Sequence, residues 1–494
     1  MVKVYKTLKY NLGYFQENIG EGPDMVMRRF KVAGQREAAL LYLDNMVNQQ
    51  LVSQFLIMPL QKLKTMPDTV EELVQNAIAI GKAKFEDDLN ILIEAILNGG
   101  GVFLLDGEAR GVILDIVKWE KRSVSEPATD VVVRGPHEGF VETLQTNISM
   151  IRRKIRHPDL VFEQMKIGRY SKTSVCIVYV KSIVKHDVLA ELRERLARID
   201  IDGILESGYI EELIEDDPFS PYPTIGTTEK PDIVAAKVLE GRLALLVDGS
   251  PIALTIPLLF VEGFQSAEDY YSRFYYVSFV RIIRYMAYFI SMVLPGLYAA
   301  ITTYHQQLIP IRLLLTMAAA EEKTPFSTGL SLLIMVFAYE VLREAGVRMP
   351  RPVGQAVSIV GAIVMGDAAV SAGLISAPVL IVVALTVISS FVTVPYAESA
   401  AVLRILFLVA GWWMGFFGIL VLGLVALLYL NSLRSFGIPY FMPFSPVVIQ
   451  QFKDVFVRFP LWSLQKRPEQ LSHNHRRMAP GLRPRPPKKE ESQG

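Results

Sequence analysis

The pattern of hydrophobic and polar positions divides the chain into two unlike parts near residue 275. Before that position, short apolar runs alternate with polar segments. After it, long apolar runs follow one another, and the longest, 405–430, carries no charged side chain. A helix rises about 1.5 Å per residue, so roughly 20 apolar residues cross a hydrocarbon core about 30 Å thick. The sequence therefore predicts a soluble part followed by an integral membrane part.

In the soluble part, some segments show the alternation of apolar residues typical of strands, and others show the 3.6-residue spacing typical of packed helices. Residues 30–44 alternate around a polar turn and predict a hairpin. Two β-rich runs flank Asp106-Gly107, and two more flank Asp248-Gly249 at an offset of 142 residues. Asp-Gly accepts φ > 0 and suits a hairpin turn. We therefore expect an α+β domain of the α/β type, built from two similar subdomains.

Four parts of the chain are expected on this basis. They are a first soluble subdomain, a second soluble α/β subdomain, a transmembrane helical domain and a basic cytoplasmic tail that is disordered at its end, with bounds 1–125, 126–275, 276–430 and 431–494. In the second subdomain, two amphipathic helices are predicted, with Asn147 and Asp187 as their N-caps.

The membrane part is predicted to be a helical bundle of five or six spans. The clear candidates are 285–303, 326–342, 353–370, 375–394 and 405–430. A further apolar stretch, 308–320, is too short to cross unless it is tilted, kinked or re-entrant. The count stays open here, because an odd number of spans places the soluble part and the tail on opposite sides of the membrane.

The distribution of charge favours the same side of the membrane for the soluble part and for the tail. The tail after Leu430 carries eleven Lys and Arg against four acidic residues, and Arg273, Arg281 and Arg284 precede the first span. Lys and Arg gather on the cytoplasmic side of a membrane, and the N-terminus lacks the uninterrupted apolar stretch of a secretory signal. However, a sixth crossing at 308–320 places the basic loop around Arg348 outside. Charge alone does not decide the count.

Composition and motifs argue against enzymes and nucleic-acid binders. The net charge is only +1, and the chain has no phosphate-binding loop, no metal-binding motif and no nucleophile elbow. No catalytic residue, metal or cofactor is expected. The single cysteine, Cys176, lies in an apolar run and is interpreted as a buried hydrophobe. His473 and His475 are assigned to a solvated tail, and the basic run around Arg152 to a solvated helix face.

Ionisable residues in the membrane part are the most informative, because a charge there is costly unless it faces protein or water. Glu340 lies three residues before Arg343, a spacing that favours an ion pair near the end of its span. Asp367 is deeper. Its helix also carries small and polar residues within one stripe, a pattern that suits tight helix packing or the lining of a pore: Gln355, Ser358, Ala362 and Gly366.

Several long motifs resemble one known family over nearly the whole chain. They are SEP (125–127), RGPHEGFVETLQTNISMIRRKIRHPDL (134–160), IGRYSKT (167–173), EDYYSRF (268–274), REAGVRMPRPVGQAVSIVGAIVMG (343–366), SLRSFGIPY (432–440), KDVFVRFPLW (453–462) and RP (467–468). Together they resemble the A subunit of GerA-type spore germinant receptors, more closely than the related SpoVAF-type sporulation protein. Asp367 departs from the family pattern, in which an uncharged amide is expected.

The resemblance implies a receptor subunit in the inner membrane of the bacterial spore, with the N-terminal domain and the tail in the cytoplasm. It implies partnership with a B subunit and a C subunit, nutrient recognition mainly through the B subunit, and oligomerisation of this subunit into a membrane channel. The residues expected to line or gate the pore are those of the 353–370 stripe together with Asp367.

Two other functions are weighed against this one. The first is a secondary transporter with a site at Glu340 and Asp367, although no internal repeat of spans supports it. The second is a non-conducting assembly platform.

Overall fold

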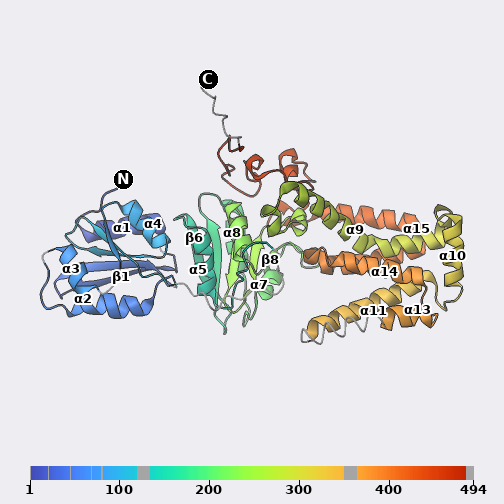
Figure 1. Ribbon diagram of the computed structural model, residues 1–494, viewed down its shortest axis with the longest axis horizontal. Helices are drawn as coiled ribbons and strands as arrows, with labels where there is room; N and C mark the ends of the chain where they lie inside the picture. Colours follow the sequence, from blue (N-terminus) through green and yellow to red (C-terminus); the bar gives the residue numbers. More distant parts are fainter. Residues whose placement is uncertain are drawn as a thin grey trace, which may run out of the picture.

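The computed structural model describes residues 2–20, 22–44, 46–67, 69–78, 82–118, 134–349 and 364–484. Three parts follow one another along its longest axis (Figure 1). A first α/β domain contains the N-terminus, a second α/β domain occupies the middle, and a bundle of long helices lies beyond it.

The first domain is a five-stranded antiparallel sheet with helices on both faces. Its elements are α1 (Leu8–Ile19), β1 (Met25–Val32), β2 (Arg36–Leu43), the π-helical turn η1 (Leu51–Ile57), α2 (Met58–Lys62), α3 (Val70–Ala77), β3 (Ala83–Glu86), α4 (Leu89–Leu97), β4 (Gly101–Leu105) and β5 (Gly111–Leu114). The strand order is β1-β2-β4-β5-β3. β1 and β2 form the hairpin predicted for residues 30–44.

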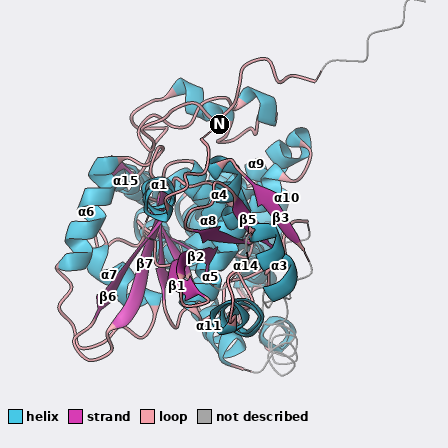
Figure 2. Ribbon diagram, turned by 90° about the vertical axis from the view of Figure 1, so that its left-hand side faces the viewer, coloured by secondary structure: helices cyan, strands magenta, loops and turns pink. Residues whose placement is uncertain are grey.

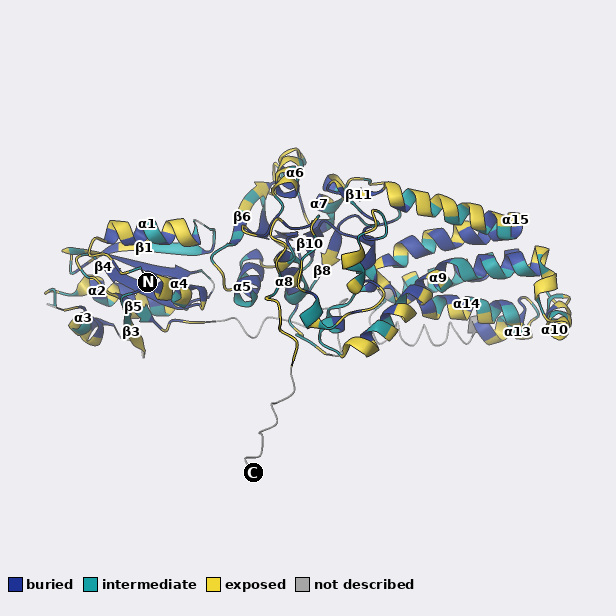
Figure 3. Ribbon diagram, turned by 90° about the horizontal axis from the view of Figure 1, so that it is seen from above, coloured by how far each residue is buried: buried dark blue, intermediate teal, exposed yellow. Residues whose placement is uncertain are grey.

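Side chains along the central strands point alternately to the two faces of the sheet, and this explains why helices cover both faces. Leu40 of β2 and Phe103 of β4 pack with η1, α2 and α3, whereas their neighbours Leu41 and Leu104 pack with α1 and α4. Successive side chains of a strand point to opposite faces, so a strand buried on both sides is apolar throughout. Figure 3 shows these strands in dark blue between the helices.

The second domain has the same architecture. Its elements are α5 (Leu144–Lys154), β6 (Leu160–Ile167), β7 (Thr173–Val180), α6 (His186–Ala197), α7 (Ser207–Ile214), β8 (Gly226–Thr228), α8 (Pro231–Leu239), β9 (Leu243–Val247), β10 (Ala253–Ile256) and the 3-10 turns η2 (Phe260–Phe264) and η3 (Ala267–Tyr270). The strand order β6-β7-β9-β10-β8 repeats that of the first sheet. Figure 2 shows the strands in magenta, with helices around them.

Equivalent hydrogen bonds show how far the two domains correspond. Asp106 accepts from the Leu8 N–H at 2.8 Å, and Asp248 accepts from the Leu144 N–H at 3.1 Å. The Gly107 N–H in one domain and the Gly249 N–H in the other donate to the segment before the first helix, each at 2.7 Å. Both glycines have φ near +89°, which only glycine adopts at little cost. Each Asp-Gly turn therefore fixes a helix as well as a hairpin.

The predicted N-caps are wrong, and the basic run is solvated only in part, since Arg156 and His157 are exposed but Arg152 is not. Asn147 lies inside α5 and bonds the backbone of Val141, while Asp187 lies in the first turn of α6. Arg152 is buried and pairs with Asp24 of the first domain at 2.9 Å. Cys176 is fully buried in β7, as predicted.

The helical part begins directly after η3. Its elements are α9 (Phe274–Tyr304), the 3-10 turn η4 (Gln306–Leu308), α10 (Ile311–Glu321), α11 (Thr328–Arg348), the π-helical turn η5 (Val364–Ala368), α13 (Ala369–Ser371), α14 (Ala377–Ser390), the 3-10 turn η6 (Val394–Tyr396) and α15 (Ala397–Ser432). Within the described residues, two helical segments are long and apolar enough to cross a bilayer, Phe274–Tyr304 and Val394–Ser432.

The segment after α15 packs against the second domain. It contains the short strands β11 (Arg434–Ser435) and β12 (Ile438–Pro439) and the 3-10 turns η7 (Ile449–Lys453) and η8 (Leu461–Ser463). Tyr440 and Met442 are fully buried, and the His473 N–H donates to the Ile183 carbonyl at 2.8 Å. The side chains of His473 and His475 are exposed, as predicted, but the backbone around His473 is held against the second domain.

Candidate functional site

The residues predicted to line the pore lie at the edge of the described region. Gln355, Ser358 and Ala362 lie outside the described residues. Gly366 and Asp367 lie in η5. Gly366 is buried facing α14, where an added Cβ would lie 3.5 Å from a Leu380 methyl group. Asp367 is exposed. Their role in a pore stays a prediction.

Glu340 belongs to a charge network that connects three helices. Its Oε2 lies 2.7 Å from Arg343 Nη2, the pair expected from the spacing. Its Oε1 lies 2.8 Å from Nη1 of Arg404, a residue of α15 whose side chain is completely buried. Arg404 Nε also donates to the Ser291 carbonyl of α9 at 2.8 Å. The network therefore holds α9, α11 and α15 together.

Sequence reasoning missed Arg404. One signal was present, since this lone arginine stands directly before the uncharged run 405–430. A charge at that position needs a partner inside the bundle. The partner lies 64 residues away in the chain, and no local spacing identifies it.

The longest apolar run is not one straight span. Gly415, in the middle of α15, has φ +61° and ψ −143°, which no helix contains. The Ser399 hydroxyl donates to the Pro221 carbonyl, and the Tyr429 hydroxyl donates to Asp217 at 2.9 Å. In a straight helix these two donors would lie about 45 Å apart. Because both reach the same loop of the second domain, α15 is a helical hairpin that reverses at Gly415.

Close contacts with α9 lock this hairpin. An added Cβ on Gly418 would meet the Ala410 carbonyl of the other leg, and one on Gly411 would meet the Gly296 backbone of α9. At the reversal, the His305 ring stacks on Phe416 with centroids 4.3 Å apart. Small residues let helix backbones approach closely, and close packing replaces the hydrophobic effect inside a membrane.

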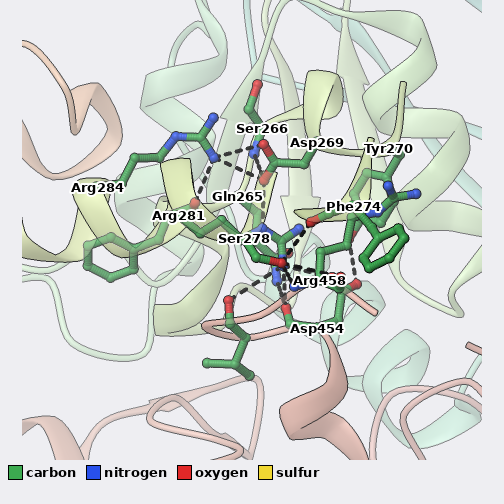
Figure 4. Close-up of polar contacts among 12 residues, drawn as sticks. Gln265, Ser266, Asp269, Tyr270, Phe274, Ser278, Arg281, Arg284, Asp454 and Arg458 are labelled. Carbon is green, nitrogen blue, oxygen red and sulfur yellow. Dashed lines mark hydrogen bonds and ion pairs between the residues drawn. The ribbon is translucent and has the colours of Figure 1, made fainter. Parts of the chain in front are cut away.

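A buried ion cluster lies where the second domain meets α9 (Figure 4). Arg281 of α9 is completely buried and lies 2.7 Å from both Asp269 and Asp454. Arg284, one turn later, lies 2.9 Å from Asp269. The two arginines and two aspartates that form these ion pairs balance one another in charge. Burial, and then the Asp454 carboxylate, raises the pKa of Tyr270 well above its ordinary value, so its hydroxyl stays protonated and donates to Asp454 at 2.7 Å.

This cluster connects three segments that are distant in sequence. Asp269 belongs to η3 at the end of the second domain, Arg281 to α9, and Asp454 to the segment after α15. In addition, the Arg458 N–H donates to the Ser278 hydroxyl at 3.1 Å. Sequence reasoning treated the arginines only as markers of the cytoplasmic side and missed their acidic partners. The start of α9 is therefore fixed both to the α/β domain and to the C-terminal segment.

An aromatic core continues from this junction into the bundle. Phe260 of η2 stacks on Tyr396 with ring centroids 5.3 Å apart, and the Tyr396 hydroxyl donates to the Phe260 carbonyl at 2.6 Å. Tyr288 of α9 and Tyr440 of the C-terminal segment complete the contact. One hydrophobic core thus includes the second sheet and the first halves of α9 and α15. The second sheet and these helices are therefore packed together in one core.

No cluster of metal-binding residues occurs within the part of the chain that the structure describes. The arrangement is that of a mechanical connection between an α/β module and a helical bundle.

Comparisons with known proteins find relatives over nearly the whole chain. The family model of the Bacillus/Clostridium GerA spore germination protein matches residues 13–470. Spore germination protein KA of Bacillus subtilis (strain 168) is 43% identical over 98% of this chain and 90% of its own length. Spore germination protein GerLA of Bacillus cereus is 36% identical over 92% of this chain and 94% of its own length.

Among solved structures, one that matches is similar in sequence to about half of this chain. It is the N-terminal domain of the A subunit of the Bacillus megaterium spore germinant receptor GerK3, with 35% identity and a TM-score of 0.42 over 52% of this chain and 97% of that domain.

Proposed function

The chain belongs to the GerA family of spore germination proteins, and on this basis we propose that it is the membrane subunit of a nutrient germinant receptor that assembles into a nutrient-gated ion channel. Its partners are the receptor B and C subunits and further copies of itself, and the nutrient binds through the B subunit. The protein lies in the spore inner membrane, and helix 353–370 lines or gates the pore.

The exposed carboxylate of Asp367 carries this proposal. The neighbouring α14 exposes apolar side chains such as Ile381 and Ile388, as expected of a helix that faces lipid. Asp367 is exposed in the same bundle, and within the described residues it has no ion-pair partner. A carboxylate facing lipid costs several kcal/mol, so an exposed one in a bundle is expected to face water or another subunit. A water-filled path between assembled subunits meets that requirement.

Five described helical segments can be assigned as crossings: α9, α11, α14 and the two legs of the α15 hairpin. The span predicted at 353–370, most of which lies outside the described residues, would be the sixth. α10 has 11 residues, about 16 Å of helix, and is not counted, whereas α14, with 14 residues, is counted because the uncharged run 375–394 around it is long enough to cross. An even number of crossings would put the α/β domains and the C-terminal segment on the same side of the membrane, and their direct contacts support this arrangement. We propose that this side is the cytoplasm. Cysteines at 322 and 415 are then labelled from outside, and one at 347 is protected; labelling at 347 contradicts this topology.

One of the two residues proposed for a transport site is already engaged in ion pairs. Glu340 already holds two arginines, so its carboxylate is not free for a substrate. A transport site would rest on Asp367 alone.

Bulky substitutions in the proposed pore helix test the proposal. Gly366→Leu and Ala362→Leu are expected to abolish nutrient-triggered ion release from spores while the receptor complex still assembles. Gly423→Leu is the matched control, because no atom lies within 4 Å of an added Cβ at that position. Unchanged ion release in assembled Gly366→Leu and Ala362→Leu receptors contradicts the pore assignment.

A further inference from the structure

Residues 447–461, which we call the interfacial segment, expose large apolar side chains although they lie outside the helical bundle. Ile449 is 81% exposed and Val447 70% exposed. The remaining exposed apolar residues of the segment are Phe456, Val457, Phe459 and Leu461. Such a concentration of exposed apolar side chains marks an interaction surface rather than a surface that faces water.

The interfacial segment is held against the first turns of α9. Arg281 pairs with Asp454, and the Arg458 N–H donates to the Ser278 hydroxyl (Figure 4). The Ser278 hydroxyl and Arg281 belong to the first two turns of α9. The segment therefore lies at the level at which the chain enters the helical bundle.

The first turns of α9 are themselves rich in exposed aromatic residues. Phe274, Tyr275, Tyr276 and Phe279 are all exposed, and Met286 and Phe289 continue this surface toward the bundle. Aromatic side chains collect at the boundary between membrane and water, because their rings are apolar and their polar groups stay hydrated. The two exposed apolar sets belong to segments that contact each other at the Arg458–Ser278 and Arg281–Asp454 pairs.

The stretch of sequence that contains the segment has a net positive charge. Residues 447–467 contain four Lys or Arg and one acidic residue, Asp454, which pairs with Arg281. Lys453 and Lys466 are exposed. Exposed lysines beside apolar side chains match the surface of an anionic leaflet, where headgroups attract cations and the acyl boundary accepts apolar groups.

We propose that the interfacial segment docks on the cytoplasmic leaflet of the membrane and that its partner is an anionic lipid surface. This inference rests on the membrane orientation given under the proposed function. The Arg281–Asp454 pair then joins the first span to a lipid-bound segment, so the start of α9 is held at a fixed depth.

Site-specific fluorescence in vesicles tests the docking. The full-length chain is labelled at Ile449→Cys with an environment-sensitive dye and reconstituted with spin-labelled lipids, with and without phosphatidylglycerol. The native Cys176 is fully buried, so the unmodified chain serves as a blank for labelling. Leu420→Cys, on an exposed face of α15, is the positive control, and Tyr10→Cys, in the first domain, is the negative control.

The expected result is quenching at 449 by lipids labelled near the headgroup, strengthened by phosphatidylglycerol, with none at 10. Lys453→Gln and Lys466→Gln are each expected to weaken docking by about fivefold. Quenching at 420 without quenching at 449 overturns the docking and leaves the membrane bundle intact. Absence of quenching at 420 overturns the membrane orientation itself. Shielding of 449 from aqueous iodide without quenching by lipid assigns the surface to a protein partner, which also contradicts the proposal.

Discussion

The Glu340–Arg404 pair allows one prediction to be worked out in detail. Glu340→Gln removes the negative charge that faces a completely buried guanidinium 2.8 Å away. Breaking a buried ion pair on one side costs about 3–5 kcal/mol, because the remaining charge is left without a counter-charge. Glu340 is 21% exposed, and glutamine still offers an oxygen to Arg404. We therefore expect a loss of about 2–3 kcal/mol.

The same helix supplies a matched control. Glu344 pairs with Arg348 at 2.6 Å, but both side chains are more than half exposed. Exposed pairs contribute about 0–1 kcal/mol, so Glu344→Gln is expected to change stability by less than 1 kcal/mol. The assay is unfolding of the purified protein in sodium dodecyl sulfate, followed by the loss of helical circular dichroism.

A third variant separates the lost charge pair from a general packing defect. Glu340→Leu combined with Arg404→Met replaces the pair by apolar side chains and is expected to recover most of the lost stability. Equal stabilities of Glu340→Gln and Glu344→Gln would refute the reasoning, because the burial of Arg404 would then have no energetic consequence.

Three further predictions concern other parts of the molecule. Burial and neighbouring carboxylates raise the pKa of Glu211 to about 7, so the folded state binds an extra proton and stability falls as pH rises from about 4.5 to about 7. Glu211→Gln should remove most of this slope in pH-dependent unfolding and stabilise the protein by about 2 kcal/mol above pH 7. Gly411→Leu should cost about 2–3 kcal/mol in detergent unfolding, because its side chain meets the α9 backbone, whereas Gly423→Leu should be nearly neutral. Asp24→Asn should cost about 3 kcal/mol in thermal unfolding, because it leaves the buried Arg152 without a counter-charge.

Local signals in the sequence predicted the local structure well. The β1–β2 hairpin and the β-rich runs flanking Gly107 and Gly249 follow from short runs and turn residues, whose effects act within a few positions. The burial of Cys176 follows from its apolar surroundings. The N-caps failed because Asn147 uses its side chain to hold the preceding loop, a choice that the helical pattern does not reveal.

Contacts between residues far apart in the chain could not be predicted from the sequence, for physical reasons. Arg281 and Asp454 are 173 residues apart, so nothing in the spacing of either marks the pair. The reversal of α15 was missed because both legs are uniformly apolar and periodicity does not record a change of direction. Gly415 is one of four glycines in that run, and only its backbone angles distinguish it. The pore-lining role of Gln355, Ser358 and Ala362 stays a prediction, because these residues lie outside the described region.

The most direct test of the proposed channel is an electrical recording from planar bilayers that contain the purified chain together with its receptor partners. We predict a nutrient-dependent ionic current whose conductance or ion selectivity changes in Asp367→Asn, while Glu344→Gln behaves as the unmodified chain. A complex that assembles and binds nutrient but passes no current would contradict the channel and leave the assembly platform as the explanation.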